Sequence, residues 1–208
     1  MKMIGRKERE HRLRRRSILE AAQEMFARKG FPGTTMGDVS RQSEFGMSTL
    51  YKFFKSKREI YASLIDEHIS RLQERLRGIT EADVAGEKAI ERFIERHLQY
   101  FQENAQFFRI YMNEKFGLAH GSMDGLSEQV RAQISRYAEH AEDALRNWIE
   151  ESDALCGDSR AKALALISTV DAHLSRWLSE GKVECARERA SSIVDIFFSP
   201  RSASVTRT

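Results

Sequence analysis

The sequence predicts an all-α protein: a small N-terminal head of three helices, followed by a larger helical bundle, with about nine helices in total. Apolar residues recur every three or four positions along most of the chain, which is the spacing of a helix face. No stretch alternates apolar and polar residues long enough to indicate a strand. Only two prolines interrupt the 208 residues, and a hydrophobic fraction of 41% is typical of a globular chain.

The first expected helix covers residues 11–29. Lys29 and Gly30 give it a basic last turn and a glycine C-cap, and residues 31–33 (Phe-Pro-Gly) indicate a turn. Its apolar residues follow the spacing of one helix face: Leu13, Ile18, Leu19, Ala22, Met25 and Phe26.

Two short helices are expected next, at about 36–42 and 46–53. Thr34 or Thr35 can cap the first of them, with Asp38 three residues after Thr35 in the place of a capping-box acid. Helices of about seven residues cannot bury a core alone, so they need the amphipathic helix before them. The three together form a helix-turn-helix head.

The rest of the chain is predicted to form longer helices. Ser56 can cap a helix at 57–77, after which Gly78 to Gly86 break the pattern. We therefore expect a head at residues 1–56, including a basic N-terminal arm, and a body at residues 57–208. Further body helices are expected at about 87–103, 105–116, 123–152, 159–180 and 185–198.

Charge is divided unevenly between the two parts, although the net charge is only +3. Residues 1–58 hold 15 Lys and Arg against 6 Asp and Glu, whereas the remaining 150 residues hold 19 against 25. This segregation indicates a polyanion as the partner of the head. A basic tail on acidic lipid is the alternative, but it would not need the ordered helical pattern of the head.

The second short helix would bury Leu50, Phe53 and Phe54 and direct its other side outward. Small hydroxyls, a tyrosine and a lysine there can bond phosphates or base edges. In the arm, Lys2 to Arg16, eight basic residues can reach a minor groove or follow the backbone. The expected DNA-facing residues are Met47, Ser48, Thr49, Tyr51 and Lys52, with Arg14 and Arg15 from the arm.

The head resembles the DNA-binding domain of the tetracycline-repressor (TetR) family. The resemblance covers about residues 12–65 and is most specific over residues 48–57 (Ser-Thr-Leu-Tyr-Lys-Phe-Phe-Lys-Ser-Lys). It also includes the run of residues 18–22, Lys29-Gly30-Phe31 and Thr34-Thr35-Met36.

This resemblance implies a dimeric transcriptional repressor that binds a palindromic operator in double-stranded DNA and leaves it when a small-molecule effector binds. It implies that Thr35 and Lys57 each bond a phosphate, and that Met47, Ser48, Thr49 and Tyr51 meet bases and backbone. It further implies a body that binds the effector and dimerises through its last two long helices.

The turn of the head departs from the family pattern. Glu44 stands where the family usually has a glycine, at a position that typically adopts a positive φ. That conformation costs a non-glycine residue roughly 1 kcal/mol. Gly46 replaces the usual capping serine at a loss of only a few tenths of a kcal/mol.

Two sets of body residues fit the implied roles. An aromatic and soft cluster is a candidate effector pocket for a small apolar or aromatic ligand, although ordinary core is the alternative for each member: Phe93, His97, Phe101, Phe108, Tyr111, Met112, Phe116 and Trp148. Apolar stripes on the last two helices are a candidate dimer interface, with burial inside one chain as the alternative: Leu164, Ile167, Leu174, Leu178, Ile193, Val194 and Phe197.

Other classes of function find little support. None of the five histidines after the head has a glutamate three residues before it, as a di-iron bundle requires, and no nucleotide-binding or hydrolase motif is present. We expect no enzyme, cofactor or metal site, two reduced cysteines, no membrane segment and a cytoplasmic location. A DNA-binding regulator without an effector, or an activator, remains an alternative.

Overall fold

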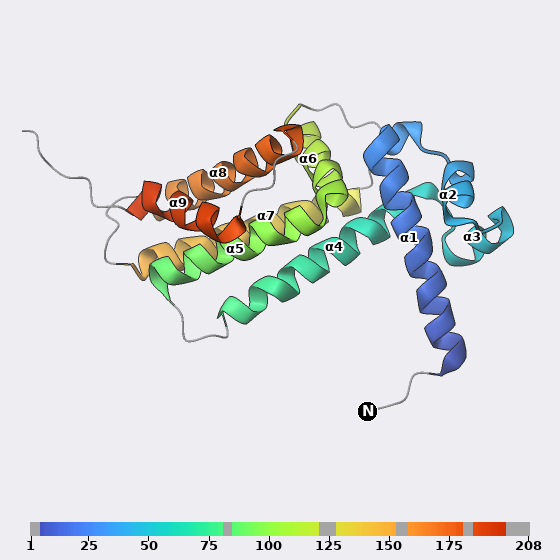
Figure 1. Cartoon of the computed structure of the whole chain (residues 1–208), viewed down its shortest axis with the longest axis horizontal. Helices are drawn as coiled ribbons and strands as arrows, with labels where there is room; N and C mark the ends of the chain where they lie inside the picture. The colour runs from blue at the N-terminus through green and yellow to red at the C-terminus, as the bar shows by residue number, and fades with distance from the viewer. Residues whose placement is uncertain (1–4, 81–84, 121–127, 153–157, 181–184, 199–208) are drawn as a thin grey trace, which may run out of the picture. The chain divides into compact units, whose positions relative to one another are not determined.

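The computed structural model describes residues 5–80, 85–120, 128–152, 158–180 and 185–198, and over these residues the chain forms nine helices and no strand (Figure 1). The predicted all-helical architecture is confirmed. The helices are α1 (Arg6–Gly33), α2 (Met36–Ser43), α3 (Met47–Phe53), α4 (Lys57–Thr80), α5 (Gly86–Glu103), α6 (Ala105–His120), α7 (Glu128–Glu150), α8 (Ser159–Glu180) and α9 (Ala186–Phe198).

Contacts divide the chain into two compact units. Unit 1 comprises Met1–Arg71 with Asn104–Ser135, and unit 2 comprises Leu72–Glu103 with Arg136–Thr208. The long helices α4 and α7 therefore contribute residues to both units. The expected division at residue 56 concerns function rather than contacts, and it stays a prediction.

Helix α1 begins at Arg6, five residues before the expected start, so much of the basic arm is helical. Ion pairs one turn apart, Glu8 with Arg12 and Glu10 with Arg14, stabilise this extension. Leu13 lies within it and is 60% exposed, so the buried stripe of α1 starts at Ile18 rather than at Leu13.

The end of α1 follows the prediction in part. Gly30 has a φ of 69° and interrupts the helical geometry, as expected of a glycine at a helix end. One further turn containing Pro32 continues to Gly33, and the hydroxyl of Thr34 then donates to the Gly30 carbonyl oxygen at 2.8 Å.

The caps of α2 and α3 are those that the sequence predicts. Thr35 and Asp38 form a complete capping box on α2, and Gly46 is the N-cap of α3. Glu44 ends α2 in the left-handed conformation, with φ 58° and ψ 14°. The turn thus keeps its usual shape, and Glu44 bears the strain that a glycine would relieve.

The core of unit 1 is aromatic. The ring of Tyr61 on α4 meets the ring of Phe26 on α1 edge to face, with centroids 4.9 Å apart. Leu50 and Phe54 pack beneath α3 with at most 1% of their surface exposed. Burial of such side chains contributes roughly 1.5–3 kcal/mol each, which is what holds the short helices α2 and α3 on α1.

A buried histidine joins three helices of the same unit. His68 on α4 stacks on Phe107 of α6 at 4.0 Å, and its Nε2 lies 2.6 Å from the Gln23 side-chain oxygen on α1. Gln23 in turn donates to Gln106 of α6 at 3.4 Å. Burial, with the nearby charge of Arg71, lowers the pKa of His68 from 6.5 to about 4, so the ring is neutral near pH 7.

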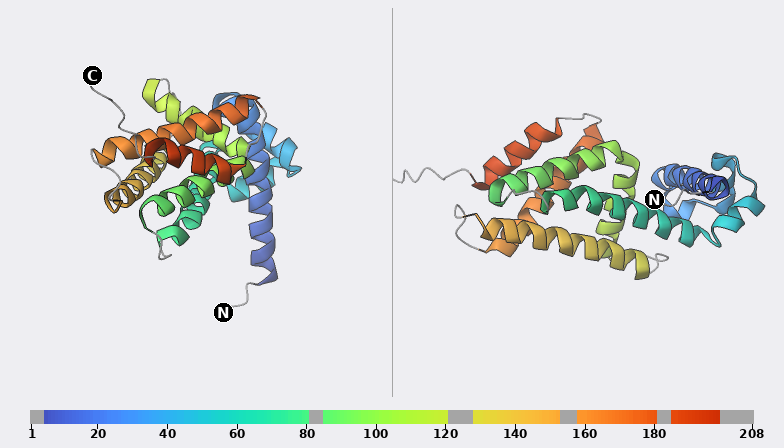
Figure 2. Two further views of the ribbon diagram at one scale, coloured as in Figure 1. Left: turned by 60° about the vertical axis from the view of Figure 1, so that its left-hand side comes forward. Right: turned by 90° about the horizontal axis from the view of Figure 1, so that it is seen from below.

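In unit 2, α5 packs against both α8 and α9, which also contact one another (Figure 2). Its inner face is almost continuously apolar because Ile90, Phe93, Ile94 and Leu98 are all buried. None of the described helices is long and apolar enough to cross a membrane.

Replacing Glu44 by glycine is expected to raise the free energy of unfolding by about 1 kcal/mol, since only glycine adopts this φ without strain. Urea denaturation measures the change. Glu44→Ala is the matched control, because it removes the same carboxylate but keeps the strained φ. Equal stabilities of the glycine and alanine variants would show that the turn stores no strain.

The low pKa of His68 predicts that acid destabilises the fold. Between pH 6.5 and pH 4 the unfolded chain takes up a proton at this residue and the folded chain does not, so stability falls as the pH falls through this range. The full difference corresponds to about 3 kcal/mol. His68→Gln can still bond Gln23 but cannot titrate. Its unfolding free energy is expected to depend less on pH, and parallel pH curves for the two proteins would refute the assignment.

Candidate functional site

The outer face of α3 is open to solvent. Tyr51 is 51% exposed and Met47 is 39% exposed, although both belong to residue types that are usually buried. Ser48 and Lys52 are also exposed, whereas Thr49 is half-buried. The predicted orientation of α3 is correct for Leu50 and Phe54, which are buried, whereas Phe53 is only half-buried. The polar and aromatic face is turned outward.

The basic arm is fixed beside the end of α3. The ring of His11 lies 4.6 Å from that of Phe53, which keeps Phe53 half-buried. A hollow of about 210 Å³ beside this contact is lined by Lys7, Glu10 and Arg14. Arg14 thus lies on the same side of α1 as the end of α3.

Arg15 points in a different direction from Arg14. Its guanidinium lies 5.1 Å from the centre of the Phe54 ring and 3.8 Å from the carboxylate of Glu67 on α4. The structure therefore gives Arg15 contacts within unit 1 as well as a half-exposed surface.

Thr35 uses its hydroxyl for the cap of α2. The hydroxyl donates to Asp38 Oδ2 at 2.7 Å and accepts from the Asp38 backbone N–H at 3.1 Å. Asp38 also binds Lys29 and Arg41, and these bonds, with those to Thr35, hold its pKa well below the usual range. The carboxylate ties α1 to α2.

Lys57, the first residue of α4, faces the end of α1. Its Nζ donates to the carbonyl oxygens of Phe31 at 2.6 Å and Thr34 at 2.7 Å, and lies 4.3 Å from the Phe31 ring centre. Burial, with the neighbouring charge of Arg58, lowers the pKa of Lys57. A cation beside these carbonyls stabilises the negative end of α1.

Unit 2 contains a groove of about 310 Å³ between α4 and α7, with α5 contributing to its lining. Phe93 of α5 and Trp148 of α7 meet there at 5.9 Å. The lining residues are Gln73, Leu76 and Arg77 of α4, Phe93 of α5, and Tyr137, His140, Ala141, Ala144 and Trp148 of α7.

A buried polar pair lies behind the groove. The hydroxyl of Tyr137 is 2.9 Å from Nδ1 of His97, and the His97 ring lies 4.9 Å from that of Phe101. Both members are at most 5% exposed, so the hydrogen bond forms inside the aromatic core. This bond fixes the Tyr137 ring as part of the groove wall.

The predicted pocket residues are divided between the two units. Phe93 and Trp148 line the groove, whereas His97 and Phe101 lie in the core next to it. Phe108, Tyr111 and Met112 are buried in unit 1. Phe116 is part of α6, but its side chain lies outside the described residues.

The sequence analysis did not identify two parts of the groove: the residues of α4 and the small residues of α7. A usable signal was present: Tyr137, Ala141, Ala144 and Trp148 follow each other at intervals of four, three and four, which places two alanines between two large rings on one helix face. A set chosen for large soft side chains does not include these alanines, although they leave the space of the groove.

On α8 and α9 the predicted dimer interface needs a correction. Leu174, Ile193 and Val194 are at most 3% exposed within a single chain, so they have no surface to offer a partner. They belong to the core that α8 and α9 form with α5, which was the alternative interpretation for these positions.

The other predicted interface residues do reach the surface. Leu164 is 46% exposed, and Ile167, Leu178 and Phe197 are half-buried. Ile196, which the sequence interpretation left out, is 70% exposed. The run 193–198 is apolar at five of six positions, so helical spacing alone could not tell its inner face from its outer face.

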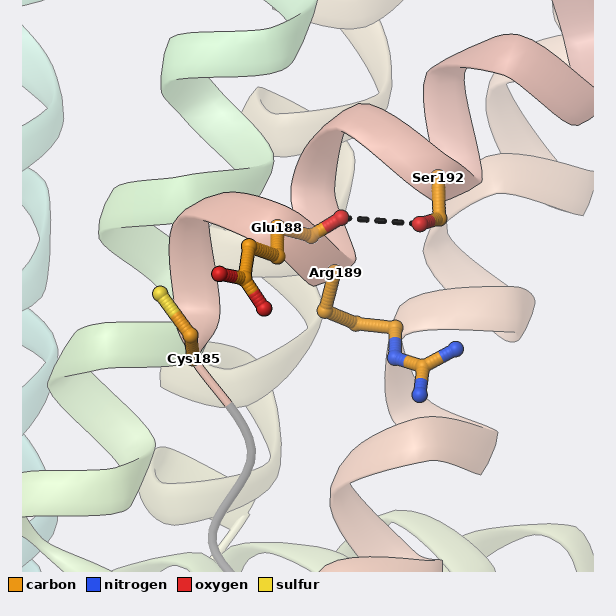
Figure 3. A pocket seen from close by; sticks show the side chains of 4 residues that line it. All are labelled: Cys185, Glu188, Arg189 and Ser192. Carbon is orange, nitrogen blue, oxygen red and sulfur yellow. Dashed lines mark hydrogen bonds between the residues drawn. The ribbon is translucent and has the colours of Figure 1, made fainter.

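A second hollow, of about 390 Å³, lies on the outer face of α9 (Figure 3). Cys185 and Glu188 turn toward each other there, and the hydroxyl of Ser192 donates to the Glu188 carbonyl oxygen at 2.8 Å. Within the described residues no group of three or more His, Cys, Asp or Glu side chains is arranged to hold a metal ion.

Comparison with known proteins agrees with this arrangement. Residues 18–64 match the family model described as bacterial regulatory proteins, tetR family. A TetR family transcriptional regulator, PfmR of Thermus thermophilus, is 26% identical, with 87% of this chain and 96% of that chain covered at a TM-score of 0.70.

Two more distant structures share the fold. FadR of Bacillus subtilis, solved in complex with stearoyl-CoA, is 17% identical over 88% of this chain and 97% of that one, with a TM-score of 0.70. The ketosteroid regulator KstR2 of Mycobacterium tuberculosis is 21% identical over 89% and 93%, with a TM-score of 0.69. The matched head and the shared helical fold identify the chain as a TetR-family transcriptional regulator that binds DNA.

Proposed function

We propose that the chain is a dimeric repressor that binds a palindromic operator and is released from it by a small apolar effector. The observation that carries the proposal is the exposed face of α3, where Tyr51 and Met47 lie open to solvent above a buried Leu50. A solvent-exposed tyrosine and methionine on a short, firmly anchored helix are suited to contact base edges and the backbone in a major groove.

The proposed DNA-facing surface comprises α3 and the adjacent arm. Met47, Ser48, Thr49, Tyr51 and Lys52 supply base and phosphate contacts, and Arg14 supplies charge from the arm. Arg15 extends this charge from its half-exposed position. Thr35 and Lys57 support the surface, because their polar atoms bond the protein itself: Thr35 caps α2, and Lys57 holds α4 on the end of α1.

The proposed dimer forms through the outer faces of α8 and α9. On α8 the exposed residues Ala165, Ser168 and Ala172 form a stripe of small side chains beside Leu164. On α9, Ser192 and Ile196 are exposed one turn apart. Small residues allow two helices to approach closely, and the leucine and isoleucine add apolar area, so the four helices of two copies can form one bundle.

The proposed effector site is the groove between α4 and α7. Stearoyl-CoA, bound by the regulator of Bacillus subtilis, carries a long apolar chain, and the name of the mycobacterial regulator refers to ketosteroids. An apolar effector matches the groove of this chain, which Phe93, Leu76 and Trp148 line. A regulator without an effector would need no such groove.

Helix α4 offers a route for coupling, because Lys57–Arg71 belong to unit 1 and Leu72–Thr80 to unit 2. An effector that prefers one position of this helix shifts the population toward it and changes the spacing of the two heads. DNA and effector then weaken each other's binding by the same factor.

Tyr51→Ala is expected to weaken operator binding at least tenfold, because it removes a large exposed group from the reading face while leaving the buried side of α3 intact. The measurement is fluorescence anisotropy on a DNA fragment that the wild-type protein selects from a random pool. Sedimentation should still show a dimer.

Ile196→Glu is the matched variant that tests the proposed dimer interface. It places a charge on the proposed dimer face and leaves the head untouched, so both the dimer and operator binding should be lost together. If the Ile196→Glu protein were still a dimer, Ile196 of α9 would not lie in the dimer interface.

If Tyr51→Ala bound the operator with unchanged affinity, the assignment of α3 as the helix that contacts the bases would be wrong.

Lys57→Met is expected to lower the free energy of unfolding by about 1–2 kcal/mol, since its carbonyl partners lose charged donors. The slope of log affinity against log salt concentration should stay at the wild-type value. Lys52→Met, which removes an exposed cation of α3, should reduce that slope by about one. A reduced slope with unchanged stability in Lys57→Met would instead identify Lys57 as a phosphate contact.

A further inference from the structure

The groove between α4 and α7 has an elongated shape. Its α7 side runs from Tyr137 to Trp148 along one helix face, and eleven helical steps correspond to about 16 Å. Between the two rings, the lining residues Ala141 and Ala144 are small and leave room, and Phe93 of α5 is also part of the lining. A ligand that fills this space is long and narrow rather than round.

The wall of the groove is apolar over most of this length. Phe93, Trp148 and Ala141 are buried, and Leu76 adds an aliphatic side chain from α4. The Tyr137 hydroxyl is bonded to His97, so Tyr137 contributes mainly its ring. Each methylene group that a ligand buries here strengthens binding roughly fourfold.

The rim of the groove is polar and carries positive charge. Among the polar lining residues, Arg77 and His140 are exposed and Gln73 is half-buried, and no carboxylate is among the described lining residues. Arg77 pairs with Glu74 at 3.0 Å, but both side chains are more than 60% exposed. An exposed pair of this kind contributes little to stability, so the pairing with Glu74 does not prevent Arg77 from binding an anion of the ligand.

We propose that the groove binds an amphipathic anion: a straight acyl chain along Phe93, Ala144 and Trp148, with its negatively charged end at Arg77. This inference rests on the proposed effector-responsive function and adds to it the class of ligand and the residue that reads the charge. The acyl chain can arrive as a free carboxylate or as a thioester on an anionic carrier, since both bring a chain with a negative group at one end.

The two tryptophans of the chain provide the measurement. Trp148 lines the groove, whereas Trp177 is buried on α8 and is not among the lining residues. In a Trp177→Phe protein the fluorescence reports on Trp148 alone. The probes are dodecanoate, dodecanoyl-CoA and the uncharged 1-dodecanol, each kept below its micelle concentration.

We expect dodecanoate or dodecanoyl-CoA to change the Trp148 fluorescence saturably, at least tenfold more tightly than 1-dodecanol. Arg77→Gln should remove that preference and leave binding of the alcohol unchanged. Arg146→Gln is the matched control, because Arg146 also pairs with a carboxylate three residues away but does not line the groove. It should bind all three probes like the parent protein.

Ala144→Phe fills the middle of the groove from a half-buried position and should abolish binding of every probe without unfolding the chain. Equal affinity for acid and alcohol, or an Arg77→Gln variant with unaltered preference, would overturn the assignment of the charge. Binding of no probe by a protein that still binds its selected DNA would overturn the ligand class and leave the proposed regulator standing. Loss of DNA binding in the parent protein would count against the proposed function itself.

Discussion

The helix that faces outward, α3, depends on a small set of polar contacts where α1 ends. Helices as short as α2 and α3 do not persist alone in water. Asp38 binds Lys29 of α1 and caps α2, and Lys57 of α4 binds the last carbonyl oxygens of α1. These bonds fix α2 and α4 relative to the end of α1. On this support, the buried side chain of Leu50 holds α3 with its other face exposed.

Sequence patterns predicted most of the helical elements because the signals that begin and end helices are local. Thr35 with Asp38, Gly46 and Ser56 mark helix starts that the structure confirms, and the ends of α8 agree to the residue. The early start of α1 was missed because its stabilising pairs, Glu8 with Arg12 and Glu10 with Arg14, were counted as charge for a partner rather than as helix-forming contacts.

What the sequence could not predict is which side of an apolar helix faces inward. Ile193 and Ile196 are equally apolar, yet one is fully buried and the other is 70% exposed, because α5 covers only one side of α9. The candidate pocket residues are divided for a related reason: Phe93 and Trp148 line the groove, and the other described members do not. Large rings such as Phe101 and Phe108 fill space, whereas the groove lies where the side chains are small, at Ala141 and Ala144.

Ala144, the more exposed of these two alanines, gives the fold a simple way to change the shape of the groove. It is half-buried and lies seven residues from Tyr137, so a larger side chain there would shorten or divide the groove at a distance from the buried bond between Tyr137 and His97. In the proposed effector site, such a change would alter the length of ligand that the groove admits. Under that proposal, a lineage that carries this arrangement could change the compound it senses one side chain at a time, while the head continues to read the same DNA.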